Sequence, residues 1–298
     1  MLKFTKRLWE SSGMTIAIAV KVHNGVVFAS DSAATLTTTD QSGNRQVANI
    51  FNSGRKIFKL HERLPIGFIT WGEGGIGRAS ISTLAKDFRT KLMGIDKSTP
   101  DYEIDPDNYK MEEVAKLTRR FFFEEIYINE FRDNPNKPFL GLMVGGYSAR
   151  EGLPELWEID IQVDGNCPDP VLRREKEDIG LFWAGQPEVI TRIVMGHGMA
   201  LGDALIELGL PPDQVGQAVE FIGSKLEAPL VYPPMPIQDT IDLAVFLVET
   251  AIGFSRFLPG WPVVGGPIDV AAITKHEGFR WVQRKFWFRS ELNPKKGE

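Results

Sequence analysis

Residues 15–35 read TIAIAVKVHNGVVFASDSAAT, and the rest of the chain is organised around this stretch. Apolar residues alternate with other side chains over its first eight positions, and a period of two predicts a β-strand. The dipeptide Asn24-Gly25 supplies the positive φ angles of a tight hairpin, so the residues after it are expected to return as a second strand. The hairpin would bring Asp31 back beside Thr15.

The remaining chain alternates between strands and helices. Period-two or short apolar runs predict further strands at residues 56–60, 66–71, 140–147, 156–161, 181–184, 268–273 and 279–282. Helical spacing predicts helices at residues 81–92, 111–131, 189–194, 214–226 and 237–257, the fourth of them capped by Asp213. Residues 36–54 and 162–178 are polar and turn-rich and are expected to be loops.

This order of elements predicts an α+β fold. Strands joined by hairpins imply antiparallel sheets, and helices that arrive in pairs imply layers outside them. The expected fold is a four-layer αββα sandwich of two antiparallel sheets flanked by helix pairs. Residues 1–14 are expected to be an extension or propeptide and residues 286–298 a tail. Residues 15–285 are expected to form one domain, with insertions near 94–110 and 197–235.

Composition restricts the partners and the compartment. The chain has 298 residues, 43% of them hydrophobic, and a net charge of −5, which gives no positive footprint for nucleic acid. Cys167 is the only cysteine, so no disulfide can form within the chain and a thiolate metal site is excluded. No secretory signal or membrane span is evident. We expect a cytoplasmic protein without a metal or cofactor and without nucleic-acid or membrane partners.

The opening hairpin resembles the start of the proteasome β-type family of threonine N-terminal nucleophile (Ntn) hydrolases, as found in bacterial proteasome-like subunits. The matching residues are Thr15, the turn Asn24-Gly25-Val26-Val27, Asp31-Ser32, Ala34-Thr35, and Lys56 in RKIF. The stretches FITWGEGG, LGLMVGGY and VGGPIDVAAIT are also similar to the family. The likeness covers most of residues 15–285 and implies the Ntn fold and a threonine endopeptidase.

Three residues would carry the chemistry. A threonine hydroxyl is a poor nucleophile until a base takes its proton, and a free α-amine on Thr15, with a pKa of about 7.7–8.0, can serve as that base. A lysine held charged by a carboxylate would lower the pKa of this nucleophile, and Lys56 with Asp31 suits that role. The catalytic set is therefore predicted to be Thr15, Asp31 and Lys56.

The resemblance also implies substrate-binding residues. Gly72 matches a position whose backbone N–H helps to stabilise the oxyanion, and Thr35 matches one that pairs with the peptide backbone. Ala34 and Thr70 would border the pocket for the residue before the cut. Because both are small, they suggest no strong charge preference.

The family encloses its active sites within assemblies. The resemblance therefore implies that copies of this chain form a ring or helical homo-oligomer that cleaves peptides or unfolded proteins. An ATP-dependent unfoldase or a cap is the other partner that it implies.

Activity depends on the Met14-Thr15 peptide bond, because the nitrogen of Thr15 is an amide while residues 1–14 are attached. Either translation starts at Met14 and methionine aminopeptidase exposes Thr15, or the chain removes a 14-residue propeptide itself. Two alternatives stay open. The first is a non-catalytic structural subunit of the same fold, favoured by the retained extension and by Ala184, Trp261 and Val264, which replace common family Ser, Asp and Ser residues. The second is an Ntn amidase that acts on small amides.

Two other features of the sequence, a glycine motif at residues 72–77 and four histidines, are also found in functional sites. Gly72-x-Gly74-x-x-Gly77 follows a strand and opens a helix, as a dinucleotide-binding fingerprint does. The strand before it belongs to a hairpin, and no parallel strand ending in an acid follows, which argues against a dinucleotide site. The four histidines are dispersed along the sequence, and surface positions explain them better than a Ser-His-Asp or metal site.

Overall fold

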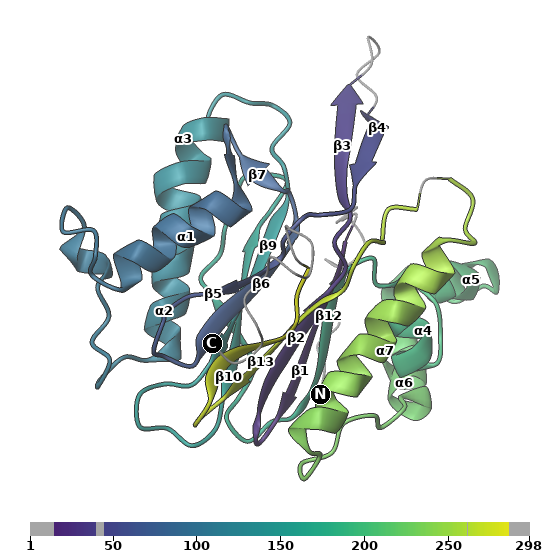
Figure 1. Cartoon of the computed structure of the whole chain (residues 1–298). Helices are drawn as coiled ribbons and strands as arrows, with labels where there is room; N and C mark the ends of the chain where they lie inside the picture. Colours follow the sequence, from purple (N-terminus) through teal and green to yellow (C-terminus); the bar gives the residue numbers. More distant parts are fainter. Residues whose placement is uncertain (1–14, 40–44, 261, 286–298) are drawn as a thin grey trace.

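The computed structural model describes residues 15–39, 45–260 and 262–285. The predicted extension 1–14, the predicted tail 286–298 and Trp261 lie outside the described residues. Within the described part, two five-stranded antiparallel sheets pack with several helices (Figure 1). This confirms the predicted mixture of helices with antiparallel sheets.

The opening hairpin lies at the centre of the first sheet. Strand β1 (Ile16–Val22) pairs with β2 (Gly25–Ser30) on one side and with β12 (Gly180–Gly185) on the other. The sheet continues from β2 to β13 (Asp269–Thr274) and then to β14 (Gly278–Gln283). Every residue of β1 and β2 is buried, because other layers cover both faces of the sheet.

The second sheet is made from the two other predicted hairpins and one additional edge strand. Strand β5 (Ile57–Lys59) pairs with β6 (Ile66–Gly72), which pairs with β9 (Leu140–Gly146). Strand β9 pairs with β10 (Glu155–Ile161), and β11 (Val171–Arg174) forms the edge. All of these pairs are antiparallel, as predicted for hairpin-linked strands.

Both predicted polar loops contain strands. Residues 36–54 hold most of a two-stranded ribbon, β3 (Ala34–Thr39) with β4 (Arg45–Phe51), and residues 162–178 hold β11. The ribbon stands out beyond the two sheets (Figure 1), so it has no buried face to impose an apolar period. Its threonines and valine favour strands by β-branching alone, a signal that the hydrophobic pattern does not contain.

The helices match the predicted positions closely. Their bounds are α1 (Ile81–Leu92), α2 (Met111–Arg119), the π-helical segment η3 (Arg120–Tyr127), α3 (Ile128–Phe131), α4 (Glu188–Met195), α5 (Leu201–Glu207), α6 (Pro212–Leu226) and α7 (Ile237–Ser255). Two short elements complete the chain, the 3₁₀ turn η2 (Pro100–Tyr102) and a small hairpin of β7 (Gly75–Ile76) with β8 (Ala79–Ser80). Asp213 lies in the first turn of α6, and the residue before the helix is Pro211, so the predicted cap is wrong.

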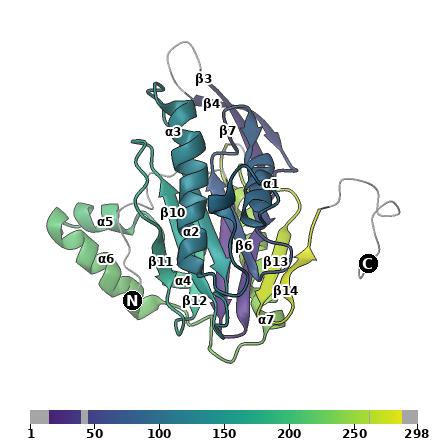
Figure 2. The same cartoon turned by 90° about the vertical axis from the view of Figure 1, so that its left-hand side faces the viewer.

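Three hydrophobic clusters hold these elements together. In one, α1, α2 and η3 pack on the second sheet, with Phe122 in ring contact with both Phe68 and Phe88. In another, α4 and α7 pack on the first sheet, where Leu247 belongs to the same cluster as Ile18. The third lies between the sheets and includes residues of both. Figures 1 and 2 show the two groups of helices on opposite sides of the strands.

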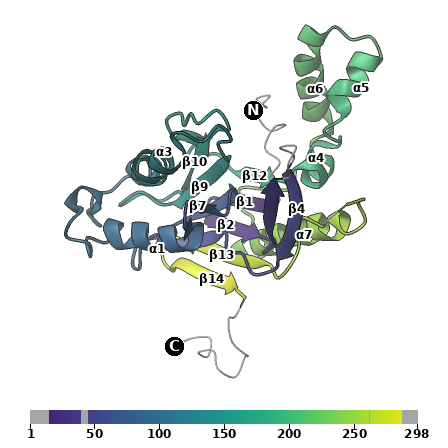
Figure 3. The same cartoon turned by 90° about the horizontal axis from the view of Figure 1, so that it is seen from above.

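Helices α5 and α6 form a hairpin that extends from the body next to α4 (Figure 3). They contact each other and have few buried residues, in contrast to α7. None of the helices in the described part is both long and apolar enough to cross a membrane.

Candidate active site

Asp31 is the centre of the hydrogen bonding at the end of the opening hairpin. Strand β2 ends at Ser30, which pairs with Ala17, so the next residue returns to the start of β1. The Asp31 side chain is 0% exposed. Its Oδ1 accepts the Ile16 N–H at 3.1 Å and the Lys56 Nζ at 2.5 Å, and its Oδ2 accepts the N–H groups of Ala33 at 3.1 Å and Gly265 at 3.0 Å. Four donors compensate for the water that this buried carboxylate has lost.

Thr15 is held from two directions. Its carbonyl oxygen accepts the Gln186 N–H at 2.7 Å, and the next residue, Ile16, is bonded to Asp31. Gly185 lies directly against Thr15, with a φ of +93°, and a Cβ added there would be 1.9 Å from the Thr15 carbonyl oxygen. Only glycine fits this position. Backbone contacts therefore fix the position of Thr15, and Thr15 also lines a cleft.

Lys56 lies just before β5, and its side chain is 9% exposed. Burial is the main cause that lowers the pKa of Lys56, and the positive charge of Lys285 lowers it further. Asp31 opposes both effects through its charge and its hydrogen bond, and Asp269 opposes them through its charge. Lys56 consequently releases its proton more readily than a surface lysine, while Asp31 keeps the ammonium in a defined place.

A cleft of about 1080 Å³ opens beside these residues. Six of the seven residues predicted for the site line it: Thr15, Ala34, Thr35, Lys56, Thr70 and Gly72. The seventh, Asp31, lies behind the cleft wall and contacts Lys56 from the protein interior. The structure thus brings the predicted residues together from the start of β1, the residue after β2, strands β3 and β6, and the segment before β5.

The predicted substrate-binding residues differ in their hydrogen bonding. The Thr70 hydroxyl donates to the Gly141 carbonyl at 3.0 Å, whereas the buried Thr35 hydroxyl finds no hydrogen-bond partner among the described residues. Gly72 has a φ of +89°, and a Cβ there would be 2.6 Å from the Phe139 carbonyl oxygen. The position therefore requires glycine, and its role towards an oxyanion stays a prediction.

Sequence reasoning missed several charged residues of the cleft. Arg55, Lys86, Lys137 and Lys285 also line it, and the carboxylate among the described lining residues is Glu73. Arg55 directly precedes Lys56 in the sequence, so its place near the site could have been predicted from the RKIF motif. Lys285 follows the last described strand, and nothing in the local sequence connects it with Thr15.

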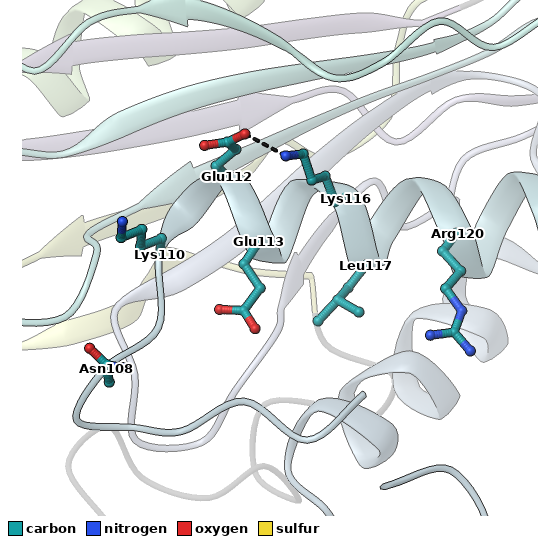
Figure 4. A pocket seen from close by; sticks show the side chains of 7 residues that line it. All are labelled: Asn108, Lys110, Glu112, Glu113, Lys116, Leu117 and Arg120. Atoms are coloured by element: carbon teal, nitrogen blue, oxygen red, sulfur yellow. Dashed lines mark hydrogen bonds and ion pairs between the residues drawn. The ribbon is translucent and has the colours of Figure 1, made fainter. Parts of the chain in front are cut away.

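A second, smaller hollow lies on the outer surface of α2 (Figure 4) and has a volume of about 530 Å³. The side chains that line it are mostly exposed and polar, and Lys116 forms an ion pair of 2.5 Å with Glu112, one helical turn away. Exposed pairs of this kind are ordinary on helix surfaces. This hollow has no buried charged group comparable to Asp31 or Lys56.

The structure also bears on the other motifs. Strand β6, which precedes Gly72-x-Gly74-x-x-Gly77, lies between two antiparallel neighbours, β5 and β9. The parallel strand–helix–strand unit of a dinucleotide site is therefore not formed here. Among the described residues, no group of three His, Cys, Asp or Glu side chains is placed to hold a metal ion.

Comparison with known proteins gives little support for a family. No family model matches the chain, and no curated protein matches it. Among solved structures, Anbu (ancestral beta-subunit) from Yersinia bercovieri is similar at 17% sequence identity and a TM-score of 0.44, over 91% of this chain and 88% of that one. A likeness this weak indicates neither activity nor assembly.

These findings correct the assignment of the chain to the proteasome β-type family of threonine Ntn hydrolases. The assignment depended on a few residues of one hairpin and on short glycine-containing strands. Such residues are also common for structural reasons, because threonine favours strands and Asp, Asn and Gly favour turns.

Proposed function

We propose that this protein is a hydrolase that cleaves amide bonds in peptides, with the Thr15 hydroxyl as nucleophile once its α-amine is free. One observation carries the proposal. The Oδ1 atom of the buried Asp31 accepts both the Lys56 ammonium and the N–H of Ile16, the residue after Thr15. A threonine, a lysine and a carboxylate therefore meet where a cleft reaches the start of β1.

The reaction proceeds in two steps. The free α-amine of Thr15 accepts the hydroxyl proton, and Oγ1 attacks the carbonyl carbon of the substrate amide. The C–N bond breaks, the departing amine takes up the proton, and the acyl group remains on Thr15 as an ester. The Thr15 α-amine then takes a proton from water, the resulting hydroxide attacks the ester carbonyl, the bond to Oγ1 breaks, and the α-amine returns the proton to Oγ1 as the carboxylic acid product leaves. Lys56 stabilises negative charge that develops on Oγ1, and the Gly72 N–H stabilises the oxyanion.

The fold would serve this chemistry as a four-layer αββα sandwich. The cluster between the two sheets and the helix clusters on their outer faces support that arrangement. Strand β1 from one sheet and β6 from the other would then present Thr15 and Gly72 to the same cleft. The rigid layers would keep nucleophile and oxyanion donor at a fixed separation.

The cleft favours peptide substrates. Its volume of about 1080 Å³ is slightly above the roughly 300–1,000 Å³ of small-molecule pockets, so an extended chain of several residues has room. Basic side chains outnumber the acidic one in its lining, which favours acidic or neutral substrates over basic ones. The proposal also includes self-association, an unfoldase or cap as a partner, and a cytoplasmic location.

The test compares two proteins, the chain from Met1 and a chain made to begin at Thr15 by cleavage of a fused leader. Fluorogenic peptides with acidic, neutral and basic residues before the cut are assayed together with small amides, and intact mass verifies each N-terminus. We expect peptide hydrolysis only from the protein that begins at Thr15, with activity retained in Thr15→Ser and lost in Thr15→Ala.

The other outcomes separate the alternatives. Hydrolysis that survives Thr15→Ala would refute a threonine nucleophile. Turnover of small amides without peptides would identify an amidase. A correctly processed, folded protein that hydrolyses neither class would support a non-catalytic structural role.

A further inference from the structure

A second buried ion pair lies next to the pair of Asp31 and Lys56. Lys285, just after β14, places its ammonium against the carboxylate of Asp269, the first residue of β13. The backbone N–H of Lys285 also donates to Asp269 Oδ1 at 3.0 Å. Asp269 is 0% exposed and the Lys285 side chain 8%. Two contacts from one residue therefore fasten the chain after β14 onto β13.

The same ammonium connects the two segments that carry the candidate catalytic pair. Lys285 Nζ is 2.5 Å from the hydroxyl of Ser32, the residue after Asp31, and 2.8 Å from the carbonyl oxygen of Gly54, two residues before Lys56. The Gly54 N–H in turn donates to the Ser32 carbonyl at 2.8 Å. Lys285 thus links the segment that contains Asp31 to the segment that contains Lys56, and these two segments are also hydrogen-bonded to each other.

We propose that Lys285 is a positioning residue of the Thr15 site, which holds the segments of Asp31 and Lys56 together and places a second positive charge beside Lys56. The role of Lys285 in catalysis rests on the proposed function, because it acts through Lys56. Its effect on Lys56 itself is a property of the folded chain and does not require turnover.

The charges around Lys56 define what this arrangement should do. Asp31 at the end of β2 and Asp269 on β13 raise the pKa of Lys56, and Lys285 lowers it. Burial lowers the pKa of Arg55, the preceding residue in the chain, and the negative charge of Asp269 opposes this effect. Removal of the Lys285 charge takes away a positive charge that lowers the pKa of Lys56, and it also removes a cation that offsets the charge of Asp269. Both effects favour the protonated form of Lys56. Removal of the Asp269 charge has the opposite effect.

The test measures the titration of Lys56 directly, by the ¹³Cε resonance of labelled lysine, assigned through its loss in Lys56→Arg. In Lys285→Met we expect the titration midpoint of Lys56 to move to higher pH, and in Asp269→Asn to lower pH. Lys285→Arg, which keeps the charge, should stay closest to the wild type. Lys59→Met removes an equal charge from the neighbouring strand at a surface pair with Glu62, and should leave the midpoint unchanged.

The opposite directions separate positioning from general damage. If Lys285 had only a structural role, the Lys56 midpoint would shift in the same direction in Lys285→Met and Asp269→Asn, or in neither. Either result would overturn the proposal. If Lys285→Met does not fold, the sign of the shift in Asp269→Asn still decides. In the protein that begins at Thr15, the basic limb of the kcat/KM profile, which follows loss of the Lys56 ammonium, should shift to higher pH in Lys285→Met with KM little changed. An inactive wild type refutes the proposed function, whereas an unmoved Lys56 midpoint refutes the role of Lys285.

Discussion

The Nζ of Lys56 and the Oδ1 of Asp31 lie 2.5 Å apart, and the carboxylate is completely shielded from solvent. Both charges have lost most of their hydration, so each depends on the other and on the backbone donors around Asp31. Such a pair adds little net stability compared with apolar residues, but the loss of one partner leaves a buried charge uncompensated. This asymmetry makes the pair testable without any substrate.

Replacement of Asp31 should therefore be costly. We expect Asp31→Ala to lower the free energy of unfolding by about 3–5 kcal/mol, since Lys56 and three backbone N–H groups lose their acceptor. Urea denaturation measures this difference. The control is Glu62→Ala, which breaks exposed ion pairs with Lys59 and Arg89 and should cost less than about 1 kcal/mol. Similar losses in the two variants would mean that Asp31 is not a buried, paired charge.

A single methyl group at Gly185 should disturb Thr15. In Gly185→Ala the new Cβ would meet the Thr15 carbonyl oxygen at 1.9 Å, whereas Gly209→Ala has nearly the same backbone, φ +95° against +93°, and open space around it. The positive φ costs each variant about 1–3 kcal/mol. Thermal or urea unfolding should show a further loss for Gly185→Ala alone, together with loss of hydrolysis. Equal stability and activity in the two variants would contradict the placement of Thr15.

The hydroxyl of Thr35 should be dispensable. It is buried without a partner among the described residues, and we now assign the predicted pairing of Thr35 with a peptide backbone to the backbone groups of Thr35. Thr35→Val should leave KM unchanged and leave stability unchanged or raise it by up to about 1 kcal/mol. The matched control, Thr70→Val, removes a bond to the Gly141 carbonyl and should cost about 1 kcal/mol. A large rise in KM for Thr35→Val would show that its hydroxyl binds substrate.

The lowered pKa of Lys21 should make the free energy of unfolding depend on pH. Its ammonium contacts the carbonyl oxygens of Glu175 and Lys176, and burial lowers its pKa from 10.5 to about 8, against the opposing charge of Asp178. Between about pH 8 and 10.5 the unfolded chain binds more protons at this site than the folded one, so stability should rise with pH. The difference in free energy of unfolding between wild type and Lys21→Met should increase across this window. A flat or falling difference would show that the folded pKa is not depressed.

Local sequence patterns predicted the hairpins because their signals are local. The period of two and Asn24-Gly25 determine the register in which Ser30 opposes Ala17, and that register alone returns Asp31 to the start of β1. The ribbon of β3 and β4 was not predicted because its described residues bury no apolar face. The cap at Asp213 was predicted wrongly because α6 begins earlier, directly after Pro211. Capping follows backbone geometry that residue type only partly determines.

The contacts of Lys285 could not be predicted in the same way. They join residues far apart in the sequence, and a lysine after a strand is ordinarily exposed. Only the pairing of β2 with β13 and of β13 with β14 brings Lys285 to Ser32 and Gly54. The family resemblance failed for a related reason: a few residues at suitable spacing in and near one hairpin do not define the rest of the fold.

The most direct test of the central claim is to find which atom becomes acylated. The protein that begins at Thr15 is treated with a peptide β-lactone, which acylates a nucleophilic hydroxyl, and the adduct is located by peptide mass spectrometry. We predict one adduct, on the Thr15 side chain, with labelling strongly reduced in Asp31→Asn and absent from the chain that retains residues 1–14. An adduct on another residue, or equal labelling of both forms, would contradict the account.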